Sequence, residues 1–279
     1  MLARLIPAVL GVALLLGAAD AHALNPSRTY KQLPDKFNMK YEAEKVRTND
    51  GAAELNVWNF PAKTKTTSTV LIAHSGEGNM ADYLRRVDQF LSTHNVVIFD
   101  WRGYGESSEF EIDSNMYIYP HFQDDMATMF DYTRKKYAAT FDVYGFGSVG
   151  GGVALGVGWS RPEARRIIAD TPFLSMEDLE SRFESWDEPM EVPFAGYEAK
   201  NEPGRAILEN APGKNLQAVQ LIVGSNDVLF KSTDYDALIK AHKKLIAKVW
   251  VVENPDRKDN FKVDKAAYFG KVGEALGAK

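Results

Sequence analysis

The chain contains no cysteine, few histidines and little net charge, and each of these shortages removes a class of function. Among its 279 residues there are no cysteines and five histidines. Without thiols the chain can form neither disulfides nor thiolate metal sites, so the hydrophobic core alone must hold the fold. The histidines show no close ligand spacing, and we expect neither a metal nor a cofactor. A formal net charge of −5 and the lack of a basic cluster argue against a nucleic-acid partner.

The first 23 residues are typical of a cleavable secretory signal. Arg4 precedes an apolar run over residues 5–19, and the small-residue site Ala21-His22-Ala23 follows it. The run is short for a membrane span, although an uncleaved N-terminal anchor is the alternative. We therefore predict a signal peptide at 1–23 and a periplasmic or secreted protein with no integral membrane domain after cleavage.

The remaining residues, 24–279, have the pattern of a single α/β domain. Residues 41–47 and 54–60 read as strands joined by a turn at Asn49-Asp50-Gly51, a strong hairpin signal. Buried-strand runs then alternate with helical or irregular segments; they cover residues 67–74, 95–101, 141–146, 165–170, 218–224 and 248–254. This alternation predicts a mainly parallel central sheet flanked by helices, with an antiparallel hairpin at its N-terminal edge.

Residues 175–211 are the least regular part of the chain after the first two strands. They contain Trp186, three prolines before Arg205 and several acidic residues. We predict a short lid-like insertion here, with a long connection as the alternative.

One serine lies among glycines in the segment FDVYGFGSVGGGVALGVG, residues 141–158, and raises the question of a nucleophile. A nucleophile elbow places its serine on a tight strand-to-helix turn with small residues two before and two after it. Counting back from the glycine-rich helix puts Ser148 at the apex of that turn. Counting forward from the strand puts Gly147 there instead, and Phe146 is a large residue two before Ser148. We expect Ser148 at the apex, with Gly147 as the alternative.

Five segments, each following a predicted strand, carry a resemblance to a known family. They read VLIAHSGEGN, VVIFDWRGYGESS, VYGFGSVGGGVAL, IIADTPFLSMEDL and LIVGSNDVLF. Together they resemble the α/β-hydrolase superfamily, most closely its serine hydrolase branch with the monoacylglycerol lipases and acyl-protein thioesterases. The resemblance runs over most of residues 41–278 and implies a sheet whose functional groups gather at the C-terminal ends of the strands.

The resemblance also implies roles for particular residues. The loop at His74, Ser75 and Gly76 corresponds to the loop that builds the oxyanion hole, with the backbone of Gly76 and Val149 as the donors by position. Asp227 stands where the family keeps the acid that orients its catalytic histidine. Without a histidine to orient, a turn or a helix cap would explain Asp227 nearly as well.

The catalytic histidine itself has no counterpart at the expected place. No histidine follows His242, and by position Lys258 or Asp259 stands where the imidazole belongs. A lysine is protonated at neutral pH, and an ordinary carboxylate is a poor base for an alcohol. His121 is the only plausible substitute, because it follows the RGYGESS segment on the side of the sheet where the site would lie.

Two hypotheses follow from this degenerate triad. The first is an exported α/β-hydrolase-fold protein that has lost most triad catalysis and binds an acyl or other small-molecule ligand, or a protein partner. The second is a hydrolase of esters, thioesters or acyl amides that uses Ser148 with Asp227 and a displaced base such as His121. The missing histidine favours the first, since its loss in a serine protease costs about 10⁶ in rate.

Overall fold

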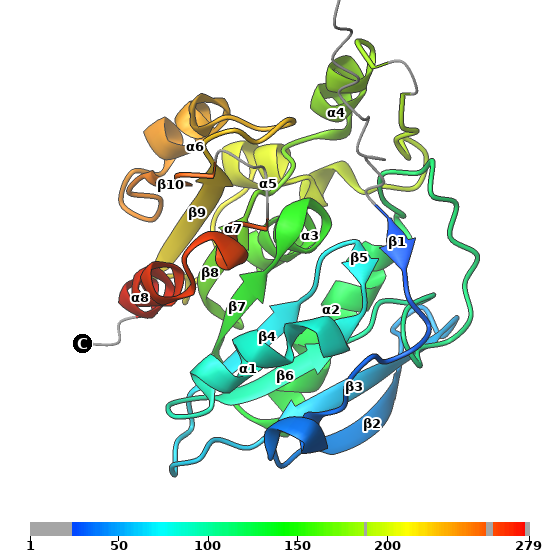
Figure 1. The fold of residues 1–279 in the computed structure, drawn as a ribbon. Helices are drawn as coiled ribbons and strands as arrows, with labels where there is room; N and C mark the ends of the chain where they lie inside the picture. Colours follow the sequence, from blue (N-terminus) through cyan, green and yellow to red (C-terminus); the bar gives the residue numbers. More distant parts are fainter. Residues whose placement is uncertain (1–23, 187–188, 255–258, 277–279) are drawn as a thin grey trace, which may run out of the picture.

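The computed structural model describes residues 24–186, 189–254 and 259–276 (Figure 1). The predicted signal peptide, residues 1–23, lies outside this part, and so does Lys258. Within the described residues, none of the helices has the length and apolar character that crossing a membrane requires.

Eight strands of the described residues form one sheet in the order β10-β9-β8-β7-β4-β6-β3-β2. Strands β2 and β3 pair antiparallel, as do β3 and β6, while the remaining neighbours are parallel. The bounds are β2 (Glu42–Arg47), β3 (Glu54–Phe60), β4 (Thr69–Ala73), β6 (Asn95–Phe99), β7 (Phe141–Gly145), β8 (Ala164–Asp170), β9 (Ala218–Gly224) and β10 (Val249–Val252). The predicted α/β class and the antiparallel hairpin at the N-terminal edge are confirmed.

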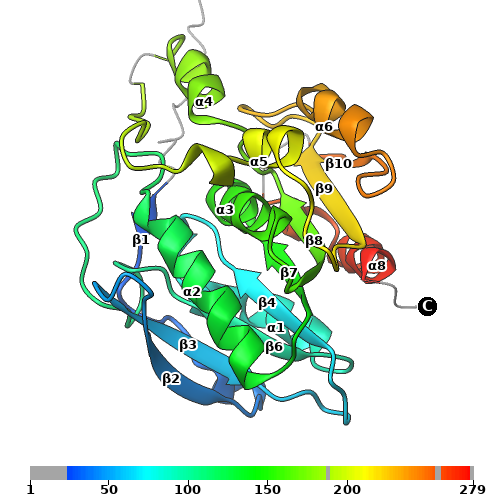
Figure 2. The same ribbon diagram turned by 180° about the vertical axis from the view of Figure 1, so that it is seen from behind.

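Helices cover both faces of this sheet (Figures 1 and 2). On one face lie α2 (His121–Lys136), α3 (Gly147–Trp159) and α5 (Pro203–Glu209), and on the other α1 (Leu84–Phe90) and α8 (Lys265–Ala275). The strand side chains alternate between the two resulting cores, so Leu71 packs on the α3 side and its neighbour Ile72 on the α1 side. Burial on both faces explains the continuous apolar runs in the sequence.

Shorter elements complete the described fold. They are the helices α4 (Met176–Phe183), α6 (Asp236–Ala241) and α7 (Asn260–Val263), and the 3₁₀ turns η1 (Pro34–Phe37), η2 (Met80–Tyr83), η3 (Ala199–Asn201) and η4 (Ser232–Tyr235). Helix α4 begins at a Ser175 cap, whose hydroxyl accepts the N–H of Asp178. In the stretch after α4, Glu191 forms an isolated parallel β-bridge with Met116. Residues 175–211 thus contain α4, η3 and α5 joined by irregular segments.

The N-terminal segment runs beside the loop that follows β4. Strand β1 (Asn25–Pro26) pairs in parallel with β5 (Glu77–Gly78), and Leu24 is fully buried in the core. Tyr30 donates its hydroxyl hydrogen to the buried carboxylate of Asp100 at the end of β6. These contacts fix the loop over the C-terminal ends of the parallel strands.

Candidate functional site

The turn from β7 to α3 is an elbow whose apex is a glycine. Gly147 has a φ of 63°, the left-handed conformation that glycine adopts without cost. Gly145 lies so close to the next turn that a Cβ on it would sit 2.2 Å from the carbonyl oxygen of Gly150. The register set by the strand therefore holds, and our expectation of Ser148 at the apex is corrected to Gly147.

Ser75 fills the space in front of the apex. A Cβ on Gly147 would lie 2.8 Å from the Cβ of Ser75. The Ser75 hydroxyl accepts a hydrogen bond of 2.7 Å from Tyr83, and the Ser75 N–H donates to the same phenol oxygen at 3.1 Å. Burial raises the pKa of Tyr83, so at neutral pH this phenol is a hydrogen-bond donor and not a base.

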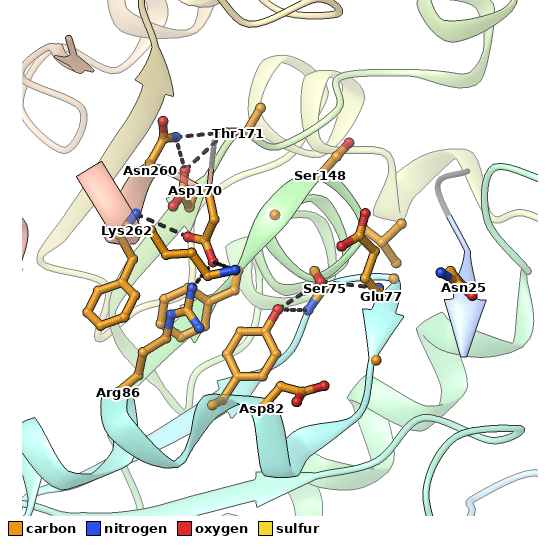
Figure 3. Close-up of a pocket in the computed structure, with 18 of the residues that line it drawn as sticks. Asn25, Ser75, Glu77, Asp82, Arg86, Ser148, Asp170, Thr171, Asn260 and Lys262 are labelled. Carbon is orange, nitrogen blue, oxygen red and sulfur yellow. Dashed lines mark hydrogen bonds and ion pairs between the residues drawn. The ribbon is translucent and has the colours of Figure 1, made fainter. Parts of the chain in front are cut away.

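Ser148 lies one residue beyond the apex, in the first turn of α3. It is half-buried, and its Oγ is buried without a hydrogen-bond partner among the described residues. In the family, the N–H of the residue after the nucleophile is the second donor of the oxyanion hole. With Gly147 at the apex, that residue is Ser148. The backbone N–H of Ser148 therefore replaces that of Val149 as the donor by position. The side chain of Ser148 points away from Asp170 and Asn260 (Figure 3).

The loop carrying His74, Ser75 and Gly76 lies against the elbow, where a Cβ on Gly150 would sit 2.4 Å from the His74 carbonyl oxygen. The carbonyl of Gly76 accepts hydrogen bonds from the Asn25 N–H and the Tyr104 hydroxyl, both at 2.8 Å. His74 is fully buried, its Nδ1 lies 2.6 Å from the carbonyl oxygen of Ser75, and burial lowers its pKa to about 3. This imidazole is therefore neutral and held away from the cavity by its backbone contact.

Asp227 follows β9 and lines the same cavity as Ser148. One of its carboxylate oxygens accepts the N–H groups of Leu229 and Phe230, both at 2.9 Å. This is the geometry of an Asp side chain closing a turn at the start of a loop. The structure thus brings Asp227 and Ser148 into one cavity without an imidazole between them in the described residues.

A guanidinium lies beside Asp259, one of the two residues that by position stand where the resemblance expects the imidazole. Arg86 of α1 forms an ion pair with Asp259, which also caps α7 by accepting the N–H of Phe261. The guanidinium carbon of Arg86 lies 4.5 Å from the ring centre of Tyr83, 4.7 Å from Phe146 and 4.3 Å from Phe261. Burial alone would lower the pKa of Arg86, but Tyr83 and Asp259 raise it on balance, so the group stays cationic.

His121, the substitute base, is not part of this site. It is exposed at the start of α2, where its ring packs edge-on against Phe110 at 5.0 Å, and it does not line the cavity. The remaining described histidines are occupied elsewhere: His94 lies near Asp142, and His242 contacts the carbonyl of Ile207.

A buried polar network beside the elbow was not foreseen from the sequence. Asp170, at the end of β8, accepts hydrogen bonds from Tyr268 at 2.5 Å and from Asn260 at 2.7 Å. Burial raises the pKa of Asp170 to about 6. Thr171, the next residue, has a φ of 52°, a strained conformation for a β-branched residue. The place of Asp170 as the last residue of a buried strand was the one sequence signal that could have identified it.

These residues surround a cavity of about 1210 Å³ at the C-terminal edge of the parallel strands (Figure 3). The elbow, the loop after β4, Asp227, Asp170 and the α7 segment all contribute to its walls. In the part of the chain that the structure covers, no group of three or more carboxylate or imidazole side chains is placed to hold a metal ion.

Comparisons with known proteins agree on the fold. An esterase from Pyrococcus furiosus, Pf2001, superimposes with a TM-score of 0.67 at 21% identity, over 91% of this chain and 96% of that one. A serine hydrolase without a lid from Xanthomonas campestris gives a TM-score of 0.55 at 15% identity, over 85% and 94% of the two chains. These similarities establish the architecture and leave the activity open.

One curated protein is similar in sequence. It is the protein bem46 of Schizosaccharomyces pombe, 28% identical over 160 residues. The match covers 55% of this chain and spans about half, 51%, of that protein's length. No protein-family profile matches the sequence.

Proposed function

We propose that this chain, which has the α/β-hydrolase fold, is an exported protein that binds a small-molecule ligand in its elbow cavity and lacks serine–histidine–acid catalysis there. The observation that carries the proposal is the φ of 63° at Gly147, which puts a residue without a side chain at the nucleophile position. The cavity volume of about 1210 Å³ favours a small molecule over the protein partner that the sequence left open.

The surroundings of Gly147 support the same conclusion. Acyl transfer by a triad needs a base that takes a proton from the attacking hydroxyl. Arg86, which lies beside Asp259, cannot accept one because its pKa is raised above an already high value. His74 is neutral, but its Nδ1 lies against the Ser75 carbonyl.

A serine hydrolase that uses Ser75 is the second candidate. Its Cβ lies 2.8 Å from the position of a Cβ on Gly147, so its hydroxyl is next to the usual place of the nucleophile. Tyr83, however, donates to that hydroxyl and has a raised pKa, so activation would need another base. The version with Ser148, Asp227 and His121 has less support, because His121 does not line the cavity.

A fluorophosphonate probe separates these candidates. We expect no covalent labelling of the purified protein and no turnover of short-chain nitrophenyl esters above buffer, with an active serine hydrolase as positive control. Ser75→Ala and Ser148→Ala variants are compared with Ser92→Ala, which changes an exposed serine outside the cavity. Labelling that disappears in Ser75→Ala, or in Ser148→Ala, would overturn the proposal and identify the nucleophile.

A further inference from the structure

We propose that the ligand of this cavity is an amphipathic anion, with a carboxylate or phosphate head on the Arg86 side of the elbow and a single alkyl chain against an apolar wall. The inference rests on the proposed function, since it names the chemical class of the ligand that the cavity binds. Three features support it: exposed cations without an ion pair among the described residues, buried donors without an acceptor there, and an apolar wall.

The first feature is a group of exposed cations at the cavity mouth. We call Lys31, Arg85, Lys262 and Lys265 the cationic rim; all four are exposed and line the cavity. Lys31, Arg85 and Lys265 form no ion pair with the described residues, and Lys262 lies 3.9 Å from Asp259.

Most carboxylates of the cavity are already engaged by the protein. Asp259 is paired with Arg86, Asp170 accepts from Tyr268 and Asn260, and Asp227 accepts two backbone N–H groups. Glu77 is exposed, but it lies across the elbow from Arg86 and Lys262 (Figure 3). Asp82 is exposed and also lines the cavity, where its side chain accepts the Asn79 N–H at 3.3 Å. Of the described carboxylates of the cavity, only Asp259 lies within 4.0 Å of a rim cation, Lys262. Lys31, Arg85 and Lys265 therefore remain available to an anion.

The second feature is an excess of buried hydrogen-bond donors. The side chain of Arg86 is 5% exposed, and its Nε has no hydrogen-bond partner among the described residues. Tyr117 is 1% exposed, lines the cavity and has an unpartnered hydroxyl, as does Ser148. Burial, followed by the charge of Asp227, raises the pKa of Tyr117 well above its usual range, so it remains a donor.

The N-terminus of α3 adds backbone donors to the same cavity. This helix has 13 residues, and its cap residue Phe146 provides no side-chain acceptor for the first N–H groups. The helix dipole makes this end partly positive, a favourable place for an anion. A ligand head that only accepts hydrogen bonds would satisfy these donors, and ionised carboxylates and phosphates have this property.

The third feature is the apolar wall, which a small inorganic anion would leave uncovered. Its members are Tyr117, Trp186, Met190, Leu229 and Phe230. Trp186, Met190 and Leu229 are only half-buried in the unliganded cavity. An alkyl chain would cover these side chains. In general, removing one methylene group from water is favourable by about 0.8 kcal/mol.

Calorimetric titration of the full-length protein with four probes tests the ligand class. The probes are decanoate, decyl phosphate, decan-1-ol and acetate, each below its critical micelle concentration. We expect the better of the two amphipathic anions to bind at least about tenfold more tightly than decan-1-ol or acetate. The ratio between decanoate and decyl phosphate distinguishes a carboxylate from a phosphate head.

A matched pair of charge variants tests the location. Lys31→Gln/Arg85→Gln/Lys265→Gln removes the three unpaired rim charges, and all three positions are exposed. The control, Lys243→Gln/Lys244→Gln/Lys248→Gln, removes as many exposed charges outside the cavity. We expect the rim variant to weaken anion binding by roughly tenfold without changing decan-1-ol binding, and the control to change neither.

The outcomes separate this inference from the proposed function. Equal affinity for decanoate, decyl phosphate and decan-1-ol, or no binding of any probe, overturns the anionic ligand. Equal effects of the rim and control variants overturn its location. Failure of the proposed function would appear in a different assay, as covalent labelling or ester turnover.

Discussion

The Cβ of Ser75 lies 2.8 Å from the point that a Cβ on Gly147 would occupy. Carbon atoms in van der Waals contact are about 3.5–4.0 Å apart, so the loop after β4 and the elbow fit together only with a glycine at the apex. The glycine at the apex and the close approach of the neighbouring loop are thus one structural feature.

This fit predicts that Gly147→Ala destabilises the protein. The left-handed conformation costs an L-residue about 1–2 kcal/mol, and the contact with Ser75 adds to it. Gly270→Ala is the matched control, because no atom lies within 4 Å of its Cβ position in α8. We expect urea unfolding to show a loss for Gly147→Ala and no loss for Gly270→Ala. Adding Ser75→Gly should recover part of the loss, and no recovery would contradict a direct clash.

Arg86 should contribute strongly to stability through Asp259 and the rings around it. Its side chain is 5% exposed and that of Asp259 30%, so breaking the pair leaves a mostly buried charge. Arg86→Met should lower the free energy of unfolding by about 1–3 kcal/mol. This is less than the usual cost of breaking a fully buried ion pair, because Asp259 is partly exposed to solvent. Arg85→Met, at the exposed neighbouring position, is the control. A double-mutant cycle with Asp259→Asn that gave no coupling would contradict this assignment.

Asp170 should make stability fall as the pH rises from about 4 to 6. Its pKa is raised to about 6 by burial, above the usual carboxyl value of 3.8, so in this range the folded state binds the proton more strongly than the unfolded state. The stabilisation is complete below the unfolded pKa and is lost as the pH rises through the folded pKa. The total is on the order of 3 kcal/mol, since one pKa unit corresponds to about 1.4 kcal/mol.

The variant Asp170→Asn isolates this contribution, because it does not titrate. Between pH 4 and pH 7, we expect the free energy of unfolding of the wild type to fall relative to that of Asp170→Asn. Asp100 and Asp125 also have pKa values raised to about 6, and both remain in the variant. A difference that stays constant over this range would rule out titration of Asp170 there.

The N-terminal segment should protect the loop after β4. Asn25 and Ser27 donate their N–H groups to the carbonyls of Gly76 and Gly78, and Tyr30 anchors the segment on Asp100. Tyr30→Phe removes the anchoring hydroxyl and should cost about 1–2 kcal/mol. We expect hydrogen exchange to speed up at Asn25 and Ser27 in this variant and to stay unchanged in β9. Unchanged exchange at both residues would mean that the anchor does not hold the segment.

Sequence alone determined the architecture, because the signals for it are local. The apolar runs that become β4, β6, β7, β8 and β9 differ from their predicted limits by at most two residues at either end. The Asn49-Asp50-Gly51 turn likewise predicted the hairpin, in which Gly51 has a φ of 71°. Periodicity and turn chemistry act over a few residues, so they can be read without knowing what packs against them.

Tertiary contacts decided the site. The choice between Gly147 and Ser148 was ambiguous in the sequence, because counting forward from the strand and counting back from the helix gave registers one residue apart. The left-handed φ of 63° at Gly147 and the close packing of Gly145, where a Cβ would lie 2.2 Å from the Gly150 carbonyl oxygen, resolve it. Arg86 reaches Asp259 across 173 residues of sequence. Such contacts join segments that lie far apart in the sequence, and no local pattern indicates that they meet. Only the tertiary structure could therefore show that Gly147 lies at the apex and that Arg86 lies beside Asp259.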